Sequence, residues 1–487
     1  MSFYLYIILA YLLVLMGFNF YRSKKVKSQD DFMVAGRQLS LTVMVFTLIC
    51  TWIGSGTFIA GAEYAAQAGF SSLWLPAGAW LGIVFIYFLA SKIRTFGQYT
   101  IGDILEVRYG PAARVWGAVA LIISFVAIVS YQFVAGGFIL NVATDGAISD
   151  SVGIIIAAVF VITFTAAAGM VAVAYTDLPN GIIILLACVV SLPFVYLKAG
   201  GFEGAHQILP QSHFTVISDE FGRHPALKAG GYFLATMLLL MGVQSMYQKF
   251  YSAKSPREAK NAVVLWIIGT IIVEVVVVAI AVFAYSIFYD KIDLSIPKSG
   301  GKLVIMAARF SVPPLVGVLL LGAACAVVIS TGMNYLLSPT TNIMRDIYQR
   351  FINPKAPQSK MVALQKVMVV LLGALAFILA MNLRSVLEMS YFAYTIYGVA
   401  ITPALIAALS WKRATKAGGL ASIVSGSIVC ITLKALTYIL PPQQVPDGDP
   451  WGIPLIYPSL VISVAALVIV SYLTPRPDEE SLEKLFT

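Results

Sequence analysis

The feature that most constrains this chain is a succession of long apolar stretches, each close to the length that crosses a bilayer. A transmembrane helix needs roughly 20 mostly apolar residues, and the sequence contains about thirteen such stretches. Charged residues make up only 11% of the chain, whereas a typical soluble domain carries about 25%. The sequence therefore predicts an all-α polytopic membrane protein. We expect the spans at residues 3–20, 41–66, 72–91, 115–141, 153–173, 178–198, 231–250, 262–288, 312–335, 362–381, 388–410, 418–440 and 455–473.

The lysines and arginines predict the orientation of these spans. Arg22, Lys24, Lys25 and Lys27 directly follow the first span, and cytoplasmic loops of membrane proteins carry an excess of basic residues. When the loops are assigned to alternate sides, most of the 32 lysines and arginines fall on that same side. We therefore predict a multi-pass protein of the plasma (inner) membrane with an external N-terminus and a cytoplasmic C-terminus. The first span lacks the basic leader and small-residue cleavage site of a signal peptide.

Composition and spacing argue against several other classes of protein. The net charge of +9 follows from the basic cytoplasmic loops, so we expect no nucleic-acid partner. The four cysteines lie inside apolar stretches and have neither disulfide nor metal spacing. His206, His213 and His224 share one polar loop, where solvated side chains are favoured over a metal site. Because no nucleophile–base pair or phosphate loop appears, we expect no enzymatic activity; no obligate protein partner is indicated.

Two of the expected spans are interrupted by glycine and polar residues. The second contains Thr51-Trp-Ile-Gly-Ser-Gly-Thr57, and the seventh contains Met241-Gly-Val-Gln-Ser-Met-Tyr-Gln248. Glycine leaves helical geometry at little steric cost, and broken backbone at membrane depth is tolerated where it is buried or lines a cavity. Helix packing through small residues is the alternative explanation for each segment. Since the two interruptions lie five spans apart, they favour a transporter built from inverted repeats.

Oxygen-bearing side chains inside the spans are candidates for binding a cation. Ser330 and Thr331 are adjacent on the ninth span, and Asn334 follows one turn later. Hard cations prefer oxygen ligands, but such hydroxyls also bond back to the preceding turn, so both roles remain open. Asp177 lies where the fifth span gives way to the sixth. An intramembrane carboxylate usually has a cation or proton nearby, and an interfacial loop carboxylate is the alternative.

Five motifs spread along the chain resemble the sodium:solute symporter family, which includes carriers of proline, sialic acid, glucose and choline. Ala168 and Lys249 depart from the family pattern, which has glycine and arginine at these positions. The resemblance implies a sodium-coupled secondary active symporter that imports a small organic solute by alternating access. A membrane sensor that keeps the transporter fold is the alternative. The motifs are Asp31-Phe-Met-Val-Ala-Gly-Arg37, Ala168-Gly-Met-Val-Ala-Val-Ala-Tyr-Thr-Asp177, Gln248-Lys-Phe-Tyr-Ser-Ala-Lys-Ser-Pro-Arg-Glu-Ala259, Arg345-Asp-Ile-Tyr348 and Trp411-Lys-Arg-Ala-Thr-Lys-Ala-Gly418.

The same resemblance implies a leucine-transporter-type fold, with five plus five helices in inverted repeats. The whole chain would form one transporter domain. It would consist of an N-terminal flanking helix and loop at 1–40, the core at 41–410, two flanking helices at 411–473 and a cytoplasmic tail at 474–487.

The resemblance also implies a site for sodium, Na+, between the second and ninth spans. Its ligands would be the backbone carbonyls of Cys50, Ile53 and Val327 and the hydroxyls of Ser330 and Thr331. Some relatives hold a second sodium, with the aspartate that matches Asp177 and with hydroxyls where this chain has Met333 and Asn334. A thioether does not bind a hard cation. We therefore expect one sodium ion, with Asp177 and Asn334 at a second ion site or along the ion path.

The substrate cavity is expected between the second, fourth, seventh and eleventh spans. The apolar run Thr236-Met-Leu-Leu-Leu-Met241 argues against a sugar, whose hydroxyls all need partners. For choline, only Trp52 matches the expected aromatic cage. Free N–H groups at the break near Gly54–Gly56 suit an anion, which favours an amino acid or another small carboxylate-bearing solute. Candidate contact residues, for each of which helix packing is the alternative, are Trp52, Ser55, Thr57, Tyr131, Gln132, Gln244, Tyr247, Tyr394 and Tyr397.

Overall fold

The computed structural model describes residues 3–23, 29–219, 221–477 and 482, and these form helices and connecting turns without a β-strand. Lys24, Lys25, Lys27 and much of the expected C-terminal tail lie outside the described residues. The α-helices are α1 (Phe3–Ser23), α2 (Gln29–Val34), α3 (Leu41–Trp52), α4 (Gly61–Ala68), α5 (Trp74–Phe96), α6 (Ile101–Tyr109), α7 (Pro111–Ala143), α8 (Asp150–Lys198), α9 (Gly201–Ile208), α10 (Pro225–Gly242), α11 (Gln244–Ser252), α12 (Pro256–Ile287), α13 (Leu303–Phe310), α14 (Pro314–Asn342), α15 (Gln358–Met381), α16 (Val386–Ala400), α17 (Thr402–Ser410), α18 (Lys416–Ile439) and α19 (Ile456–Leu473).

Twelve of the described helical runs are long and apolar enough to cross a membrane. This number is below the expected thirteen because the second expected span is broken. Its first part, α3, is too short to be counted, and the run Gly56–Phe96 is counted once. Within that run the backbone turns at Gly69, which has a φ of +58° and separates α4 from α5. A side chain at Gly69 would collide with the backbone of His213, so glycine is required there.

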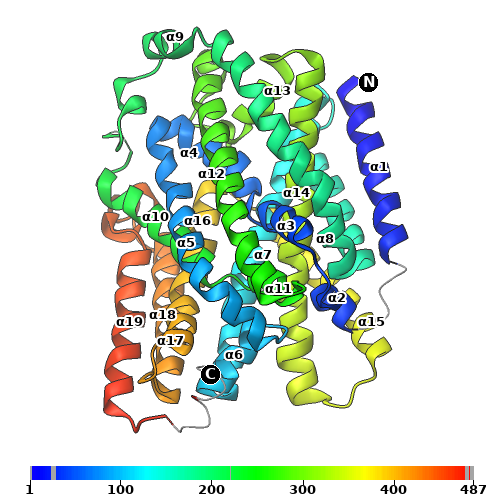
Figure 1. Ribbon diagram of the computed structural model, residues 1–487. Coiled ribbons are helices and arrows are strands. Elements are labelled where there is room, and N and C mark those ends of the chain that lie inside the picture. Colours follow the sequence, from blue (N-terminus) through cyan, green and yellow to red (C-terminus); the bar gives the residue numbers. More distant parts are fainter. Residues whose placement is uncertain (1–2, 24–28, 220, 478–481, 483–487) are drawn as a thin grey trace.

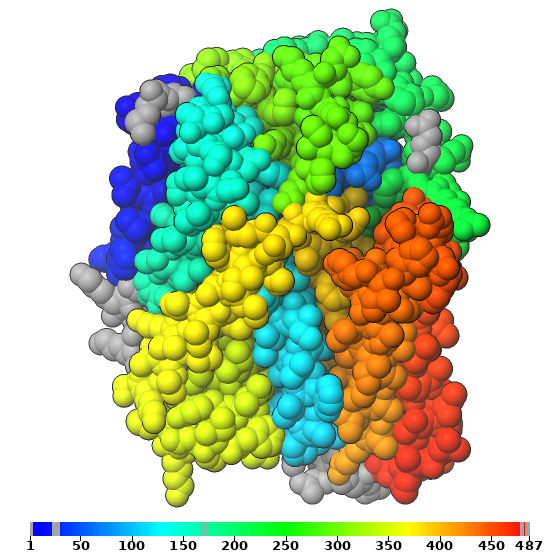
Figure 2. Space-filling view, turned by 180° about the vertical axis from the view of Figure 1, so that it is seen from behind, coloured from blue at the N-terminus to red at the C-terminus, as the bar shows by residue number. Residues whose placement is uncertain are grey.

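The helices form one bundle with peripheral helices at opposite edges (Figure 1). Helix α1 packs on α8 at one edge, and α18 and α19 pack together at the other, while α7, α8 and α14 pack against one another in the interior. From behind, α7 is visible between α15 and α18 (Figure 2). Val14, Phe88 and Leu371 are examples of large apolar side chains exposed on the outside, where lipid chains are an equally apolar environment.

Two interior helices are broken by a single extended residue, as the sequence predicts. Helix α3 ends at Trp52, Ile53 is extended (φ −69°, ψ 102°), and the chain resumes as the π-helical turn η2 (Gly56–Ala60) before α4. Helix α10 ends at Gly242, and Val243 is extended (φ −68°, ψ 119°) before α11 begins. Both breaks are buried, which agrees with the rule that irregular backbone at membrane depth is shielded from lipid.

Close approach of neighbouring side chains explains the glycines at the first break. A Cβ atom on Gly54 would lie 2.8 Å from Cγ2 of Thr331 on α14. A Cβ atom on Gly56 would lie 2.2 Å from the hydroxyl of Tyr394 on α16. Real Cβ contacts are longer than this, so glycine allows both helices to reach the broken backbone. The break is therefore the point where the second expected span meets α14 and α16.

The polar loop between α8 and α10 differs from the expectation for its histidines. His213 is buried, its Nε2 atom lies 3.1 Å from the carbonyl oxygen of Ala66, and its ring stacks on Tyr285. The expectation of a solvated side chain is therefore wrong for His213, because the loop folds back over α4 and α12. Within the described ranges, no group of three or more histidine, cysteine, aspartate or glutamate side chains has the arrangement of a metal site.

Candidate functional site

The first break places two backbone carbonyls beside the hydroxyl of Thr331. The Oγ1 atom of Thr331 lies 3.0 Å from the carbonyl oxygen of Cys50 and 3.0 Å from that of Ile53. Carbonyls at the end of a helix lack the partner that a further helical turn would provide. Val327 lies one turn before Thr331 on α14. The structure thus brings three of the five expected sodium ligands together and places the fourth on the adjacent turn.

The fifth expected ligand, Ser330, faces a carboxylate. Its hydroxyl donates a hydrogen bond to Asp177, which also accepts one from Thr47 at 2.5 Å and one from the side-chain amide of Asn334 at 3.3 Å. Asp177 is 0% exposed and lies within α8, which runs through this region with a kink at Gly169. The interfacial-loop alternative for Asp177 is therefore wrong. Ser330 connects the expected sodium site to a buried carboxylate.

A lysine side chain reaches the same carboxylate from α11. Lys249 lies at the end of the expected span 231–250, but the structure buries it completely, at 0% exposure. Its amine donates a hydrogen bond to the side-chain oxygen of Asn334 and lies 3.2 Å from the sulfur of Met170. Because Asn334 also bonds to Asp177, the amide bridges a buried amine and a buried carboxylate. The sequence carried no signal of this contact, because the family pattern also has a basic residue, arginine, at position 249.

A narrow cavity lies beside the first break and is lined by several of the expected substrate residues. Trp52, Thr57 and Tyr394 line it. Tyr131 lies one contact away, with its hydroxyl 3.2 Å from that of Tyr394. Further lining residues are Gly56, Gly61, Leu75, Pro76, Thr236, Glu274 and Val278.

Ser55 and Gln132 hold the broken backbone in place instead of lining this cavity. The side-chain oxygen of Gln132 accepts hydrogen bonds from the hydroxyl of Ser55 at 2.6 Å and from its backbone N–H at 3.1 Å. This pair connects α7 to the segment between α3 and η2. The N–H of Ser55 is therefore already partnered, although the sequence had offered such groups at the break as anion donors.

The other three expected substrate residues brace the second break. The hydroxyl of Tyr397 donates to the carbonyl of Gly242 at 2.7 Å and accepts from the N–H of Gln244 at 2.9 Å. The side chain of Gln244 accepts from the N–H of Ile101 at 2.6 Å, and Tyr247 bonds to the carbonyl of Met241 at 3.0 Å. These polar side chains satisfy backbone groups that the break releases.

Glu274 is a cavity residue that the sequence reasoning missed. It belongs to α12, is 2% exposed, and accepts hydrogen bonds from the indole N–H groups of Trp52 at 2.9 Å and Trp80 at 2.6 Å. The signal was present, because the residue interrupts the apolar run Ile271-Ile-Val-Glu-Val-Val-Val-Val278. An ionisable residue inside a span indicates a functional site by default.

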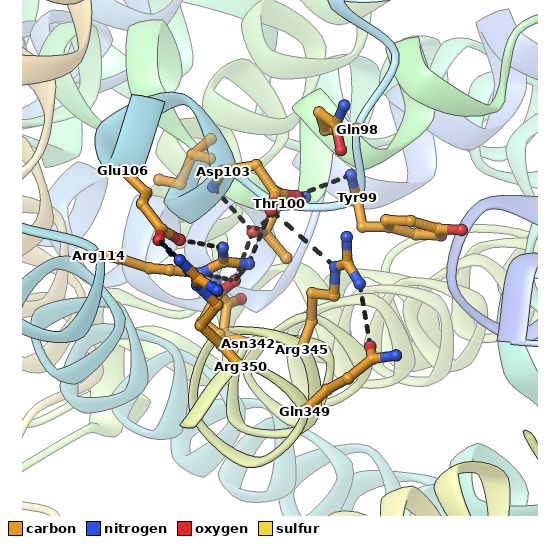
Figure 3. Close-up of polar contacts among 12 residues, drawn as sticks. Gln98, Tyr99, Thr100, Asp103, Glu106, Arg114, Asn342, Arg345, Gln349 and Arg350 are labelled. Carbon is orange, nitrogen blue, oxygen red and sulfur yellow. Dashed lines mark hydrogen bonds and ion pairs between the residues drawn. The ribbon is translucent and has the colours of Figure 1, made fainter. Parts of the chain in front are cut away.

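A second polar region joins three helical elements on the side that the sequence predicts to be cytoplasmic. Arg114 of α7 pairs with Asp103 of α6 at 2.7 Å, with Asp346 at 2.6 Å and with Glu106. Asp346 and Arg350 belong to the π-helical segment η7 (Ile343–Ile352), and Arg350 pairs with Glu106 at 2.7 Å. Figure 3 shows Arg114 and Arg350 converging on Glu106. We call these five residues the inner charge network.

Glu106 lies on α6, outside the apolar spans, and its charge is held by the network. Burial alone would raise the pKa of Glu106, but the hydrogen bonds from Arg114 and Arg350 outweigh burial and lower it below its usual value. The carboxylate is therefore ionised wherever the network is assembled near neutral pH. The network fixes α6 against α7 and η7 by charge pairing.

Known proteins with similar sequences are transporters. A family model described as the sodium:solute symporter family matches residues 32–426. The osmoregulated proline transporter OpuE of Bacillus subtilis (strain 168) is 25% identical over 488 residues, which covers 97% of this chain and 95% of that protein. The sodium/proline symporter of Escherichia coli (strain K12) is 24% identical over 492 residues, covering 97% and 93%.

Solved structures share the arrangement of helices. A sodium-coupled sialic acid symporter in a substrate-bound outward-open state has a TM-score of 0.79 at 16% identity, covering 98% of both chains. The structure of MhsT in complex with L-phenylalanine has a TM-score of 0.58 at 13% identity, covering 90% of this chain and 98% of that one. The fold is thus the leucine-transporter type that the family resemblance implies. The chain therefore belongs to the sodium:solute symporter family, with sodium as its coupling ion.

Proposed function

We propose that this protein is a sodium-coupled symporter that imports an amino acid or another small carboxylate-bearing solute across the plasma membrane by alternating access. The observation that carries the proposal is the position of the Thr331 hydroxyl, 3.0 Å from the carbonyl oxygens of both Cys50 and Ile53 at a helix break. Sodium prefers oxygen ligands, by extension of the behaviour of other hard cations. Because similar proteins are described as proline transporters, L-proline is the first solute to test.

In this proposal one sodium ion binds between α3 and α14. Carbonyls of Cys50, Ile53 and Val327 and hydroxyls of Ser330 and Thr331 are its ligands. A hydroxyl has one donor and two acceptor positions. Thr331 can therefore donate to the carbonyls or, after rotation, direct its lone pairs to an ion held among them.

Coupling between ion and solute follows from the shared segment of backbone. The candidate sodium carbonyls lie just before the break, and Trp52 and Thr57, which line the solute cavity, lie at or just after it. An ion that fixes the carbonyls also fixes the adjoining cavity wall. Each ligand then raises the affinity for the other by the same factor, as linkage requires.

The position of Lys249 supports transport with a single sodium ion. Its amine occupies the neighbourhood of Asp177, where some relatives hold a second sodium, and reaches that carboxylate through Asn334. A fixed ammonium supplies positive charge without an ion from solution. A second sodium would have to share the space with that charge, which repulsion disfavours.

Release of the solute to the cytoplasm requires the inner charge network to open. Arg114 connects α6 and η7 through Asp103, Glu106 and Asp346. While these pairs hold, the inner ends of the helices are tied together. During alternating access, the ion pairs of this network therefore break on the inner side while contacts form on the outer side.

Uptake by proteoliposomes tests the proposal. An inward sodium gradient is expected to drive accumulation of L-proline, or of another solute in a panel of amino acids, carboxylates, sugars and quaternary amines. A potassium gradient of the same size is the control. Sodium-dependent binding without uptake of any solute would instead favour the membrane sensor.

A further inference from the structure

Glu274 is a buried carboxylate whose partners in the protein are all neutral. Its two oxygens accept from the indole N–H groups of Trp52 and Trp80 at 2.9 Å and 2.6 Å. No lysine, arginine or histidine forms an ion pair with it among the residues that the structure describes. Burying an ionised carboxylate without an opposite charge is costly, so a carboxyl group at this position is stable either when it is protonated or when a cation lies beside it.

The carboxylate faces the solute cavity and not a lipid-facing surface. Glu274 lines that cavity together with Trp52, Thr57 and Tyr394. Hydrogen bonds from the two indole N–H groups fix the orientation of the carboxylate. A carboxylate has about four acceptor positions, so at least one remains for a ligand in the cavity.

Aromatic rings complete a setting that suits an organic cation. The rings of Trp52 and Tyr394 have centroids 6.3 Å apart and planes inclined by 34°. Both belong to the lining of the cavity. Aromatic faces attract ammonium groups, and desolvation strengthens the attraction. Carboxylate and rings therefore favour the same kind of group.

We propose that Glu274 binds an ammonium group of the transported solute, which restricts the solute to zwitterions such as amino acids or to organic cations. This inference rests on the proposed function; it narrows the carboxylate-bearing solutes to zwitterions and adds organic cations as a second class. It excludes simple carboxylic acids and neutral solutes as preferred substrates. A positively charged group in the cavity then supplies the counter-ion that the protein does not.

Matched ligand pairs test this proposal by direct binding to purified protein at saturating sodium. The pairs are L-alanine and L-lactate, L-proline and the same ring with oxygen in place of nitrogen, and choline and its uncharged carbon isostere. In the wild type, the ammonium-bearing member of at least one pair is expected to bind about 10- to 100-fold more tightly. Glu274→Gln is expected to bring this ratio close to one.

Two further variants control for structural effects. Glu258→Gln makes the same chemical change near the start of the same helix and is expected to keep the wild-type ratio. An amide at position 274 directs N–H groups toward one indole, so Glu274→Gln is also combined with Trp80→Phe, which removes that donor. Stabilisation by sodium against thermal unfolding, measured without any solute, reports separately whether each variant is folded and binds the ion.

The outcomes separate this inference from the proposed function. An unchanged ratio in both Glu274 variants, or no preference for ammonium in any pair with the wild type, overturns the role of Glu274. The first result would make the residue a structural anchor for the indoles. A wild-type protein that sodium does not stabilise would instead contradict the proposed function itself.

Discussion

Asp177 and Glu274 are both buried carboxylates in the helical core, but the protein treats them differently. Asp177 accepts from the hydroxyls of Thr47 and Ser330 and from Asn334, which connects it to the amine of Lys249. Among the described residues Glu274 has only neutral donors, and it lines the narrow cavity beside the first break. Asp177 thus has a counter-ion within the chain and needs no ligand to balance its charge. In our proposal, the missing counter-ion of Glu274 marks a site that a ligand completes.

Removing the built-in counter-ion is expected to have the largest effect. Lys249→Met leaves Asp177 buried and uncompensated, which typically destabilises a protein by about 3–5 kcal/mol. Thermal unfolding of the purified protein measures the loss. The double variant Lys249→Met with Asp177→Asn removes both charges and is expected to recover most of the stability. If the double variant is as unstable as the single one, Lys249 acts through packing and the comparison fails.

Removing the charge of Asp177 alone tests the same pair from the other side. Asp177→Asn keeps size and hydrogen bonding but leaves Lys249 as an unpaired buried cation close to the proposed sodium site. Sodium-driven uptake is expected to fall well below that of the wild type at low sodium and to recover partly at high sodium. Wild-type kinetics over the whole sodium range would assign Asp177 a purely structural role.

Substitutions of the two hydroxyls on α14 distinguish effects on the proposed ion site from effects on the carboxylate of Asp177. Thr331→Ala removes a group that contacts only the carbonyls of the break, and is expected to raise the sodium concentration for half-maximal uptake about 10-fold or more, the cost of one charge-assisted contact. Ser330→Ala is expected to raise it as well and also to lower stability, because Ser330 bonds to Asp177. Ser427→Ala on α18 removes a hydroxyl that bonds only to its own helix and is the matched control. Unchanged sodium dependence in the Ser330 and Thr331 double variant would remove these residues from the site.

Glu106 is a partly exposed carboxylate, and removing its charge should have the smallest effect on stability among these substitutions. Its pKa is lower in the folded protein than in the unfolded chain. Its stabilising contribution is therefore complete above the unfolded value of about 4.3 and is lost as the pH falls through the folded value. Glu106→Gln is expected to cost about 0.2–1 kcal/mol near neutral pH, within the range of exposed ion pairs. Unfolding temperatures of wild type and variant should converge in acid, and a constant difference would contradict a charge effect.

Apolar length and short motifs sufficed to predict the membrane fold, the two breaks and the contact between Thr331 and the first break. They did not predict which polar side chains serve a ligand and which serve the backbone. Gln244 and Tyr397 bond to groups freed by the second break, and their residue types would be equally suitable in a cavity. Hydropathy placed Lys249 at a helix end, but its long side chain reaches inward to Asn334. The environment of Glu274 depends on Trp80, which is far away in sequence and becomes a neighbour only when α5 packs on α12.

The number of sodium ions moved with each solute shows whether Lys249 takes the place of a second sodium beside Asp177. In proteoliposomes with opposed sodium and L-proline gradients, the voltage at which net flux stops gives this number, since each charge moved contributes about 2.3 kcal/mol per 100 mV. We expect one sodium ion and one net charge per zwitterionic solute, as a single sodium site requires. A reversal voltage that corresponds to two sodium ions per solute would contradict it and would make Asp177 and Asn334 direct sodium ligands.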